Sequence, residues 1–244
     1  MKPTPPNKFS ALATTPYRGL SLSSWTLKES RQVSVGAPVM RILAIPAVDK
    51  TIAIVACLPF VYSLWHRLVE GTLNIPQVCA ALGQLIMIAT MVLRRAPERV
   101  TPNPAWWLLA FVATYGSLFW VTVAPPGHPI VPNPVTDTLS IVSVLVVVYA
   151  RLSLGRNIGF VPAQRHLVLS GAYRFVRHPI YTGLFLAWLS FTLRLFSSAN
   201  LWILVTLYTL FFIKSIVEES FLRKDPSYAS YMNRVRYRYI PFII

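Results

Sequence analysis

The sequence predicts an all-α, polytopic membrane helical bundle of five to six transmembrane helices. Three observations predict it. Of the 244 residues, 55% are hydrophobic and only 13% are charged, and the mean hydropathy is +0.53. Soluble domains carry about 25% charged residues. The apolar residues fall into long blocks, and most of the positive charge lies in the joints between them. This pattern is typical of membrane spans and their flanks.

Six apolar runs account for the predicted helices. Most approach the ~20 residues that cross the hydrocarbon core, whereas the fourth and fifth are marginal. Only Ser197 and Ser198 separate the last two runs, so we expect a tight helical hairpin that need not cross fully. This leaves five or six spans open. The runs are Thr51–Leu68, Ile75–Leu93, Ala105–Ala124, Pro134–Leu152, Tyr181–Phe196 and Ala199–Val217.

The chain divides into three predicted parts. Residues 1–50 are basic, rich in Ser, Thr and Pro, and contain no apolar core of a secretory signal, so we expect a disordered basic leader. An organelle transit peptide and a true start at Met40 are open alternatives. Residues 51–153 hold transmembrane helices 1–4. Residues 154–244 hold the hairpin, a polar loop and a basic tail that we expect in the cytoplasm.

The distribution of charge predicts the orientation. Arg and Lys fill the joints after the second and fourth runs and the tail after the sixth, whereas residues 125–134 contain neither. The positive-inside rule therefore places both termini and the polar loop in the cytoplasm. The membrane would be the inner membrane in a bacterium, or the endoplasmic reticulum or another organelle membrane in a eukaryote. The net charge of +15 then reflects topology and contact with membrane lipids. Nucleic acid is not indicated, because no soluble basic face is left to bind it.

The loop Arg151–Ile180 is too polar to span and too long for a simple connector, which favours a functional role. Near its end, Arg177 and His178 precede Pro179, which suits the first turn of the next helix. The free N–H groups of a helix start favour a nearby anionic group. Alternatively, Arg177 anchors to lipid phosphate, His178 is an interfacial hydrogen-bonding group, and Tyr173 and Tyr181 are interfacial aromatics.

The last apolar run ends at Glu218 and Glu219, in a chain with only 8 acidic residues. They are either a solvated pair that neutralises Lys214 or partners of a ligand or of the loop. We favour the second interpretation, because carboxylates near lipid are costly unless a cation pairs with them. The two acids and the His-Pro helix entrance are therefore expected to meet in one site.

These elements resemble a known family. Arg-His-Pro-Ile-Tyr-Thr-Gly at residues 177–183 resembles the Arg-His-Pro-x-Tyr-x-Gly signature of the isoprenylcysteine carboxyl methyltransferase and phospholipid methyltransferase group. Residues 218–222 resemble its Glu-Glu-x-x-Leu element. The Ser170–Tyr173 turn and the tail from Tyr228 to Pro241 also agree with its pattern. The resemblance covers about residues 150–244.

The resemblance implies an integral membrane methyltransferase that uses S-adenosyl-L-methionine and acts on a lipophilic, prenylated or otherwise lipid-anchored acceptor. It implies a cytoplasmic cofactor-binding loop and gives roles to single residues. Catalytic roles would go to Arg234 and Arg236, facing the acceptor, and to Glu219. The cofactor would be bound by Gly171, Tyr173, Arg177, His178, Pro179, Tyr181, Glu218 and Glu219.

Carboxyl O-methylation is the favoured reaction. A carboxylate is already a nucleophile and needs only a cationic clamp, whereas an amine must lose a proton to His178 or a glutamate. Prenylcysteine enzymes usually carry Thr-Gln where this chain has Thr192 and Leu193, so prenylcysteine itself is not indicated. N-methylation of a phospholipid or another small lipophilic acceptor is the alternative.

Other classes fit the sequence less well. Sterol-type NADPH-dependent reductases tend to carry Asn where this chain has Ile180. A transporter or scaffold would place charged groups at bilayer depth in the first four runs, which offer only Gln84, Thr90 and scattered hydroxyls. No metal-ligand spacing occurs, so a metal is not indicated. The sequence does not predict the oligomeric state.

Overall fold

The computed structural model describes residues 46–70, 74–95, 97, 99–159 and 163–243. The elements below belong to one compact unit within residues 38–244. Met40 and nearly all of the predicted leader lie outside the described residues, so the structure does not test those predictions.

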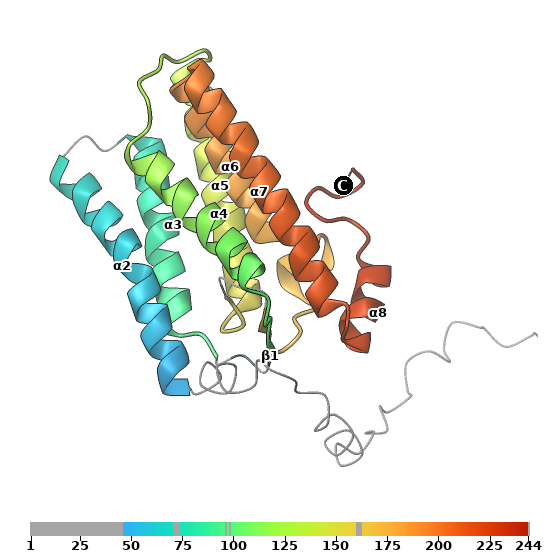
Figure 1. Ribbon diagram of the computed structural model, residues 1–244. Helices are drawn as coiled ribbons and strands as arrows, with labels where there is room; N and C mark the ends of the chain where they lie inside the picture. The colour runs from blue at the N-terminus through green and yellow to red at the C-terminus, as the bar shows by residue number, and fades with distance from the viewer. Residues whose placement is uncertain (1–45, 71–73, 96, 98, 160–162, 244) are drawn as a thin grey trace, which may run out of the picture. The chain divides into compact units, whose positions relative to one another are not determined.

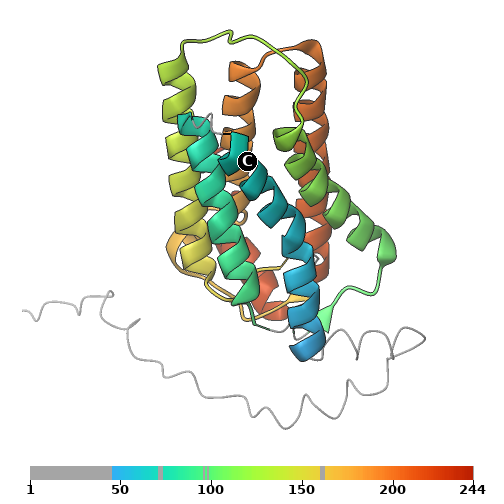
Figure 2. The same ribbon diagram turned by 90° about the vertical axis from the view of Figure 1, so that its left-hand side faces the viewer.

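Six long helices lie side by side (Figures 1 and 2). Each corresponds to one apolar run, and five are long and apolar enough to cross a membrane. The all-α fold class and the integral membrane assignment are therefore confirmed. The helices are α2 (Pro46–Glu70), α3 (Ile75–Val92), α4 (Pro104–Thr122), α5 (Asn133–Leu154), α6 (Pro179–Arg194) and α7 (Ser198–Leu222).

The exception is α6, whose 16 residues extend about 24 Å at 1.5 Å per residue, short of the ~30 Å hydrocarbon core. It joins α7 in the expected tight hairpin. Ser197 caps α7, and its side chain accepts from the backbone N–H of Asn200. The Asn200 amide donates to Leu195 O and Pro125 O, and its oxygen accepts from Trp120 Nε1 at 2.9 Å. One buried amide thus ties together the turn, α4 and the joint before α5.

Close packing of α5 against α6 forms one wall of the interior. A Cβ at Gly183 would lie 2.5 Å from Val147 Cγ2 and 3.0 Å from Ser143 O, so only glycine permits this approach. Ser140 and Ser190 exchange a hydrogen bond across the same contact. An aromatic core lies behind it, with Phe211 edge-on to Trp188 at 4.8 Å.

The basic joints gather at one end of the bundle. There β1 (Arg99–Val100) pairs antiparallel with β2 (Ala163–Gln164), and Arg95 N donates to Arg156 O at 2.7 Å. The same end carries η1 (Gly171–Arg174) and α8 (Pro226–Arg234). At the opposite end, residues 125–134 lack Lys and Arg. The gathering agrees with the charge pattern, and the assignment of this end to the cytoplasm stays a prediction.

Candidate functional site

A continuous cavity of about 390 Å³ runs from the basic end into the bundle between α3, α4, α5, α6 and α7. Its volume falls within the ~300–1,000 Å³ of small-molecule sites. The wall changes from polar to apolar along its length. Tyr173, Arg177, His178, Glu218, Tyr228 and Tyr231 line the polar part, and Met87, Leu118, Val147, Leu184 and Trp188 line the apolar part.

The His-Pro entrance of α6 forms one side of the polar part. Pro179 occupies the first turn of α6, so the His178 backbone lies outside the helix and its N–H donates to Arg238 O at 2.8 Å. Arg177 N likewise donates to Tyr237 O at 3.0 Å. One turn later, the Tyr181 ring stacks on the His178 imidazole with centroids 5.2 Å apart. The two rings form a flat aromatic wall beside the cavity.

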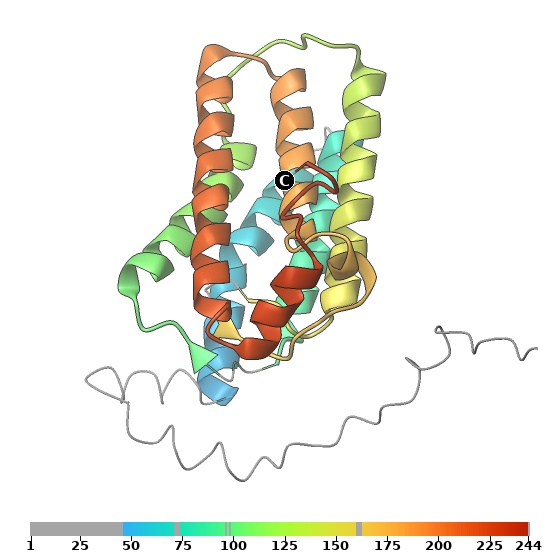
Figure 3. The same ribbon diagram turned by 90° about the vertical axis from the view of Figure 1, so that its right-hand side faces the viewer.

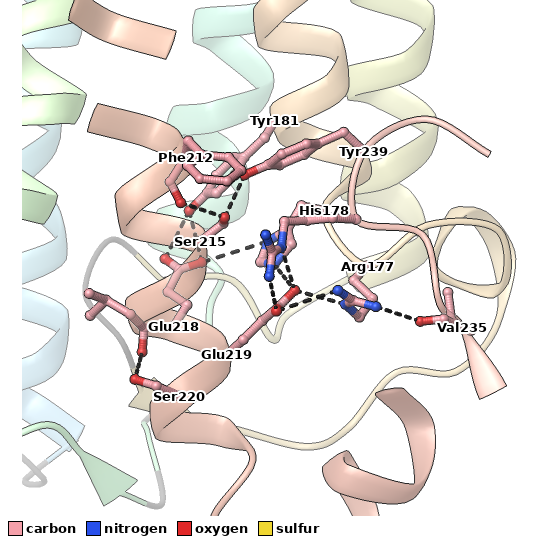
Figure 4. A network of polar contacts seen from close by, with 12 residues as sticks. Arg177, His178, Tyr181, Phe212, Ser215, Glu218, Glu219, Ser220, Val235 and Tyr239 are labelled. Carbon is pink, nitrogen blue, oxygen red and sulfur yellow. Dashed lines mark hydrogen bonds and ion pairs between the residues drawn. The ribbon is translucent and has the colours of Figure 1, made fainter. Parts of the chain in front are cut away.

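Glu218 faces the cavity. Its carboxylate accepts from the Tyr181 hydroxyl at 2.8 Å (Figure 4). The Lys214 ammonium lies 3.9 Å away. His178 Nδ1 is also 3.9 Å from it. The carboxylate therefore keeps acceptor capacity for a ligand, since two oxygens offer about four lone-pair positions.

Glu219 points to the other side of α7 and does not line the cavity. It accepts from Arg177 Nε at 2.8 Å and His178 Nε2 at 3.0 Å (Figure 4). It also accepts from the Arg238 guanidinium at 2.8 Å. Its hydrogen bond and charge hold the pKa of Arg238 above its usual value. This carboxylate is fully engaged with protein groups.

The turn before the signature is docked on the end of α5. Gly171 has a φ of +62°, and a Cβ there would lie 2.2 Å from Ser153 Oγ. The same hydroxyl accepts from Ala172 N at 3.0 Å. Glycine is therefore required for contact with α5, and Gly171 does not line the cavity.

Tyr173 follows in the same turn and does line the cavity. Its carbonyl accepts from the Tyr231 hydroxyl at 2.7 Å, which connects η1 to α8. Burial raises the pKa of the Tyr173 phenol far above its usual range, although the charge of Arg151 opposes this. Tyr173 thus presents a neutral hydroxyl at physiological pH.

The structure separates the predicted site residues into two sets. Tyr173, Arg177, His178, Tyr181 and Glu218 line the cavity, whereas Gly171, Pro179 and Glu219 lie behind its wall.

Arg234 and Arg236, predicted to face the acceptor, are exposed and outside the cavity lining. The Arg236 carbonyl accepts from Arg177. Their catalytic assignment stays a prediction.

Two buried cations in the lining were not among the predicted site residues, Arg151 on α5 and Lys214 on α7. A charged residue within an apolar run is a recognisable signal of function, and Lys214 carried that signal. Arg151 lies at the edge of its run, where a positive charge is already explained by the positive-inside rule.

Comparison with known families identifies one match. The model of the phospholipid methyltransferase family matches residues 134–228, and a search of curated proteins finds no match to the chain. The matched region begins with α5, includes the signature and both glutamates, and ends at Tyr228. It contains most of the polar lining of the cavity and stops before Arg234. The resemblance inferred from the motifs is confirmed, because residues 134–228 match the model of the phospholipid methyltransferase family, which includes the isoprenylcysteine carboxyl methyltransferases.

Proposed function

We propose that this protein is an integral membrane methyltransferase that transfers a methyl group from S-adenosyl-L-methionine to a lipophilic acceptor. The observation that carries the proposal is the continuity of the cavity. A polar part lined by the family's signature residues joins directly to an apolar part inside the bundle. A polar methyl donor and a hydrocarbon-bearing acceptor can therefore meet without leaving the protein.

The residues present fit the donor. The Glu218 carboxylate faces the cavity with acceptor capacity for an ammonium or ribose hydroxyl. The aromatic side chains of Tyr173, Tyr228 and Tyr231 offer stacking surface for an adenine ring. When bound, S-adenosyl-L-methionine supplies a methyl group on a sulfonium that is already activated for displacement.

The protein's own contribution is then positioning and exclusion of water. The apolar wall of α3, α5 and α6 holds the hydrocarbon part of the acceptor, and the stacked rings of His178 and Tyr181 border the junction with the polar part. His178 Nε2 is engaged with Glu219 at 3.0 Å, so it is poorly placed to take a proton from an amine. Carboxyl O-methylation stays the favoured reaction, because a carboxylate needs no base, whereas an amine would depend on the remaining candidate base, Glu218.

Calorimetric titration of detergent-purified protein with S-adenosylhomocysteine tests the donor site. We expect binding by the wild type and a roughly 10–100-fold loss in Glu218→Gln, the range for a hydrogen bond to a charged group. The matched control is Asp137→Asn, which removes a carboxylate paired with Arg194 and outside the cavity lining. A wild-type protein without affinity for the nucleoside would contradict the proposal.

The reaction itself is tested by incubating the protein with methyl-labelled donor and a total membrane extract. We expect label in the organic phase, released as methanol by mild base because carboxyl methyl esters hydrolyse readily. Base-stable label would show N-methylation in its place. Oxidation of added NADPH without label transfer would favour the reductase alternative.

A further inference from the structure

Two cations are buried in the wall of the cavity. The Lys214 side chain on α7 is 6% exposed, and Arg151 on α5 is 7% exposed. Charged groups in a span are costly unless a counter-charge and hydrogen-bond acceptors compensate them. The protein groups around these two cations provide only part of that compensation.

Lys214 makes no hydrogen bond to any described residue. Its ammonium lies over the rings of Tyr181 and Phe211, 5.4 and 5.1 Å from their centroids. The nearest carboxylate oxygen is Glu218 Oε1 at 3.9 Å, beyond hydrogen-bond distance, and this carboxylate already accepts from Tyr181. The three N–H donors of the ammonium are therefore available to a ligand in the cavity.

Arg151 is also incompletely paired. One of its terminal nitrogens donates to Thr90 Oγ1 at 3.0 Å, and its buried Nε has no partner within the part of the chain that the structure describes. No described carboxylate lies within ion-pair distance of its guanidinium. A planar guanidinium with free donors is suited to an oxyanion.

The other charged groups of the lining are already engaged. Arg177 is paired with Glu219, and Arg165 donates to Arg95 O at 3.1 Å. Asp225 accepts from Ser227 N at the start of α8. Glu218 is thus the carboxylate nearest to Lys214, and it does not satisfy both buried cations.

The position of Lys214 identifies the part of the ligand it meets. It lies one helical turn beyond Glu218, about 6 Å deeper at 1.5 Å per residue. The next residue of the same face is Phe211, which packs on Trp188 at the start of the apolar wall. A charge at this junction between the polar and apolar parts of the cavity is placed to meet the polar head group of an amphipathic molecule whose hydrocarbon chain occupies the apolar part.

We infer that Lys214 and Arg151 form a carboxylate-binding subsite that holds the acid group of the acceptor while its hydrocarbon chain lies along Leu184, Val147 and Trp188. The term acceptor rests on the proposed methyl transfer. The methionine part of the donor also carries a carboxylate, so the test must separate these two sources.

Scintillation proximity binding with labelled palmitate and labelled methyl palmitate tests the subsite on purified protein saturated with S-adenosylhomocysteine. We expect the wild type to bind the acid at least tenfold more tightly than the ester. Lys214→Met and Arg151→Met should each reduce this preference about tenfold. Lys214→Arg should keep most of it. The matched control is Lys224→Met, which removes an exposed lysine near the end of the same helix, outside the cavity lining.

Titration of the same variants with S-adenosylhomocysteine and its decarboxylated analogue separates the sources. Unchanged nucleoside affinity in Lys214→Met supports the acceptor subsite. The inference is overturned if the wild type binds acid no better than ester. It is also overturned if the wild type binds S-adenosylhomocysteine more tightly than the decarboxylated analogue and Lys214→Met and Arg151→Met lose this difference in place of the preference for palmitate. If the wild type prefers the acid but binds no nucleoside, the acid subsite stands and the proposed methyl transfer fails.

Discussion

Two faces of the last turns of α7 carry the same residue type in very different surroundings. Glu218 faces the cavity, with one tyrosine hydroxyl as its donor and a lysine nearby. Glu219, about 100° around the helix, is surrounded by Arg177, His178 and Arg238. The difference teaches that an acidic pair in a sequence is not a single functional unit. The Glu218 carboxylate is available to a ligand, whereas the Glu219 carboxylate is paired with groups of the protein itself.

The fold uses Glu219 to hold the C-terminal strap, residues 235–239, which runs back from α8 alongside α6 (Figure 3). Arg177 also donates to Val235 O at 2.9 Å, and Thr182 Oγ1 donates to Tyr239 O at 2.7 Å. Ser215 on α7 shares a hydrogen bond with the Tyr239 hydroxyl. The buried carboxylate and its cations therefore hold the strap beside His178 together with these hydrogen bonds.

The largest expected effect comes from removing that carboxylate's charge. Glu219→Gln leaves Arg177 and Arg238 without their counter-charge, and breaking a buried ion pair costs about 3–5 kcal/mol. We expect a strongly lowered melting temperature and rapid proteolysis of residues after Val235. A variant as stable as the wild type, with only its nucleoside affinity lost, would contradict the structural role and place Glu219 among the ligand-binding groups.

The Glu218→Gln substitution should distinguish the two faces by its effects on nucleoside affinity and on stability. Glu218→Gln removes a carboxylate that faces the cavity, so we expect nucleoside affinity to fall about 10–100-fold. Stability should fall less than in Glu219→Gln, because Glu218 has one cation, Lys214 at 3.9 Å, whereas Glu219 accepts hydrogen bonds from two arginines. Calorimetry and thermal unfolding on the same preparation give both numbers. Equal destabilisation by the two Gln variants would remove the distinction between the faces.

The sequence predicts much of this arrangement, but it does not predict which of the two glutamates faces the cavity. The apolar runs predict the six helices, and Pro179 predicts where α6 begins, because these signals are local. The position of each glutamate around α7 depends on which neighbour reaches it. The Arg238 partner of Glu219 comes from the strap, whose path has no local signal. Arg151 and Lys214 are 63 positions apart in the chain and line the same cavity from two different helices, which only the tertiary packing reveals.

Tail arginines provide a finer comparison. Arg238 donates to Glu219, whereas Arg234 is exposed. Removing one of several donors to a carboxylate costs about 1–3 kcal/mol, so Arg238→Gln should lower the unfolding free energy measurably. Arg234→Gln should leave it unchanged.

The activity of these tail variants tests the sequence-based assignment separately. If Arg234 faces the acceptor, Arg234→Gln raises the KM for the acceptor without affecting stability. An unchanged KM in both Arg234→Gln and Arg236→Gln would remove these residues from the catalytic set.

The smallest effect concerns the hydroxyl that orients Glu218. Tyr181→Phe keeps the ring stacked on His178 and removes only the donor at 2.8 Å from the carboxylate. A hydrogen bond to a charged acceptor contributes about 1.5–3 kcal/mol at most, and the carboxylate can still turn toward Lys214. We therefore expect a nucleoside affinity a few-fold below wild type, measured by titration, with the strap and its protease resistance intact. Of the two glutamates, Tyr181 donates to Glu218 and not to Glu219. Loss of strap protection in this variant would therefore show that the two faces are coupled through the His178 ring.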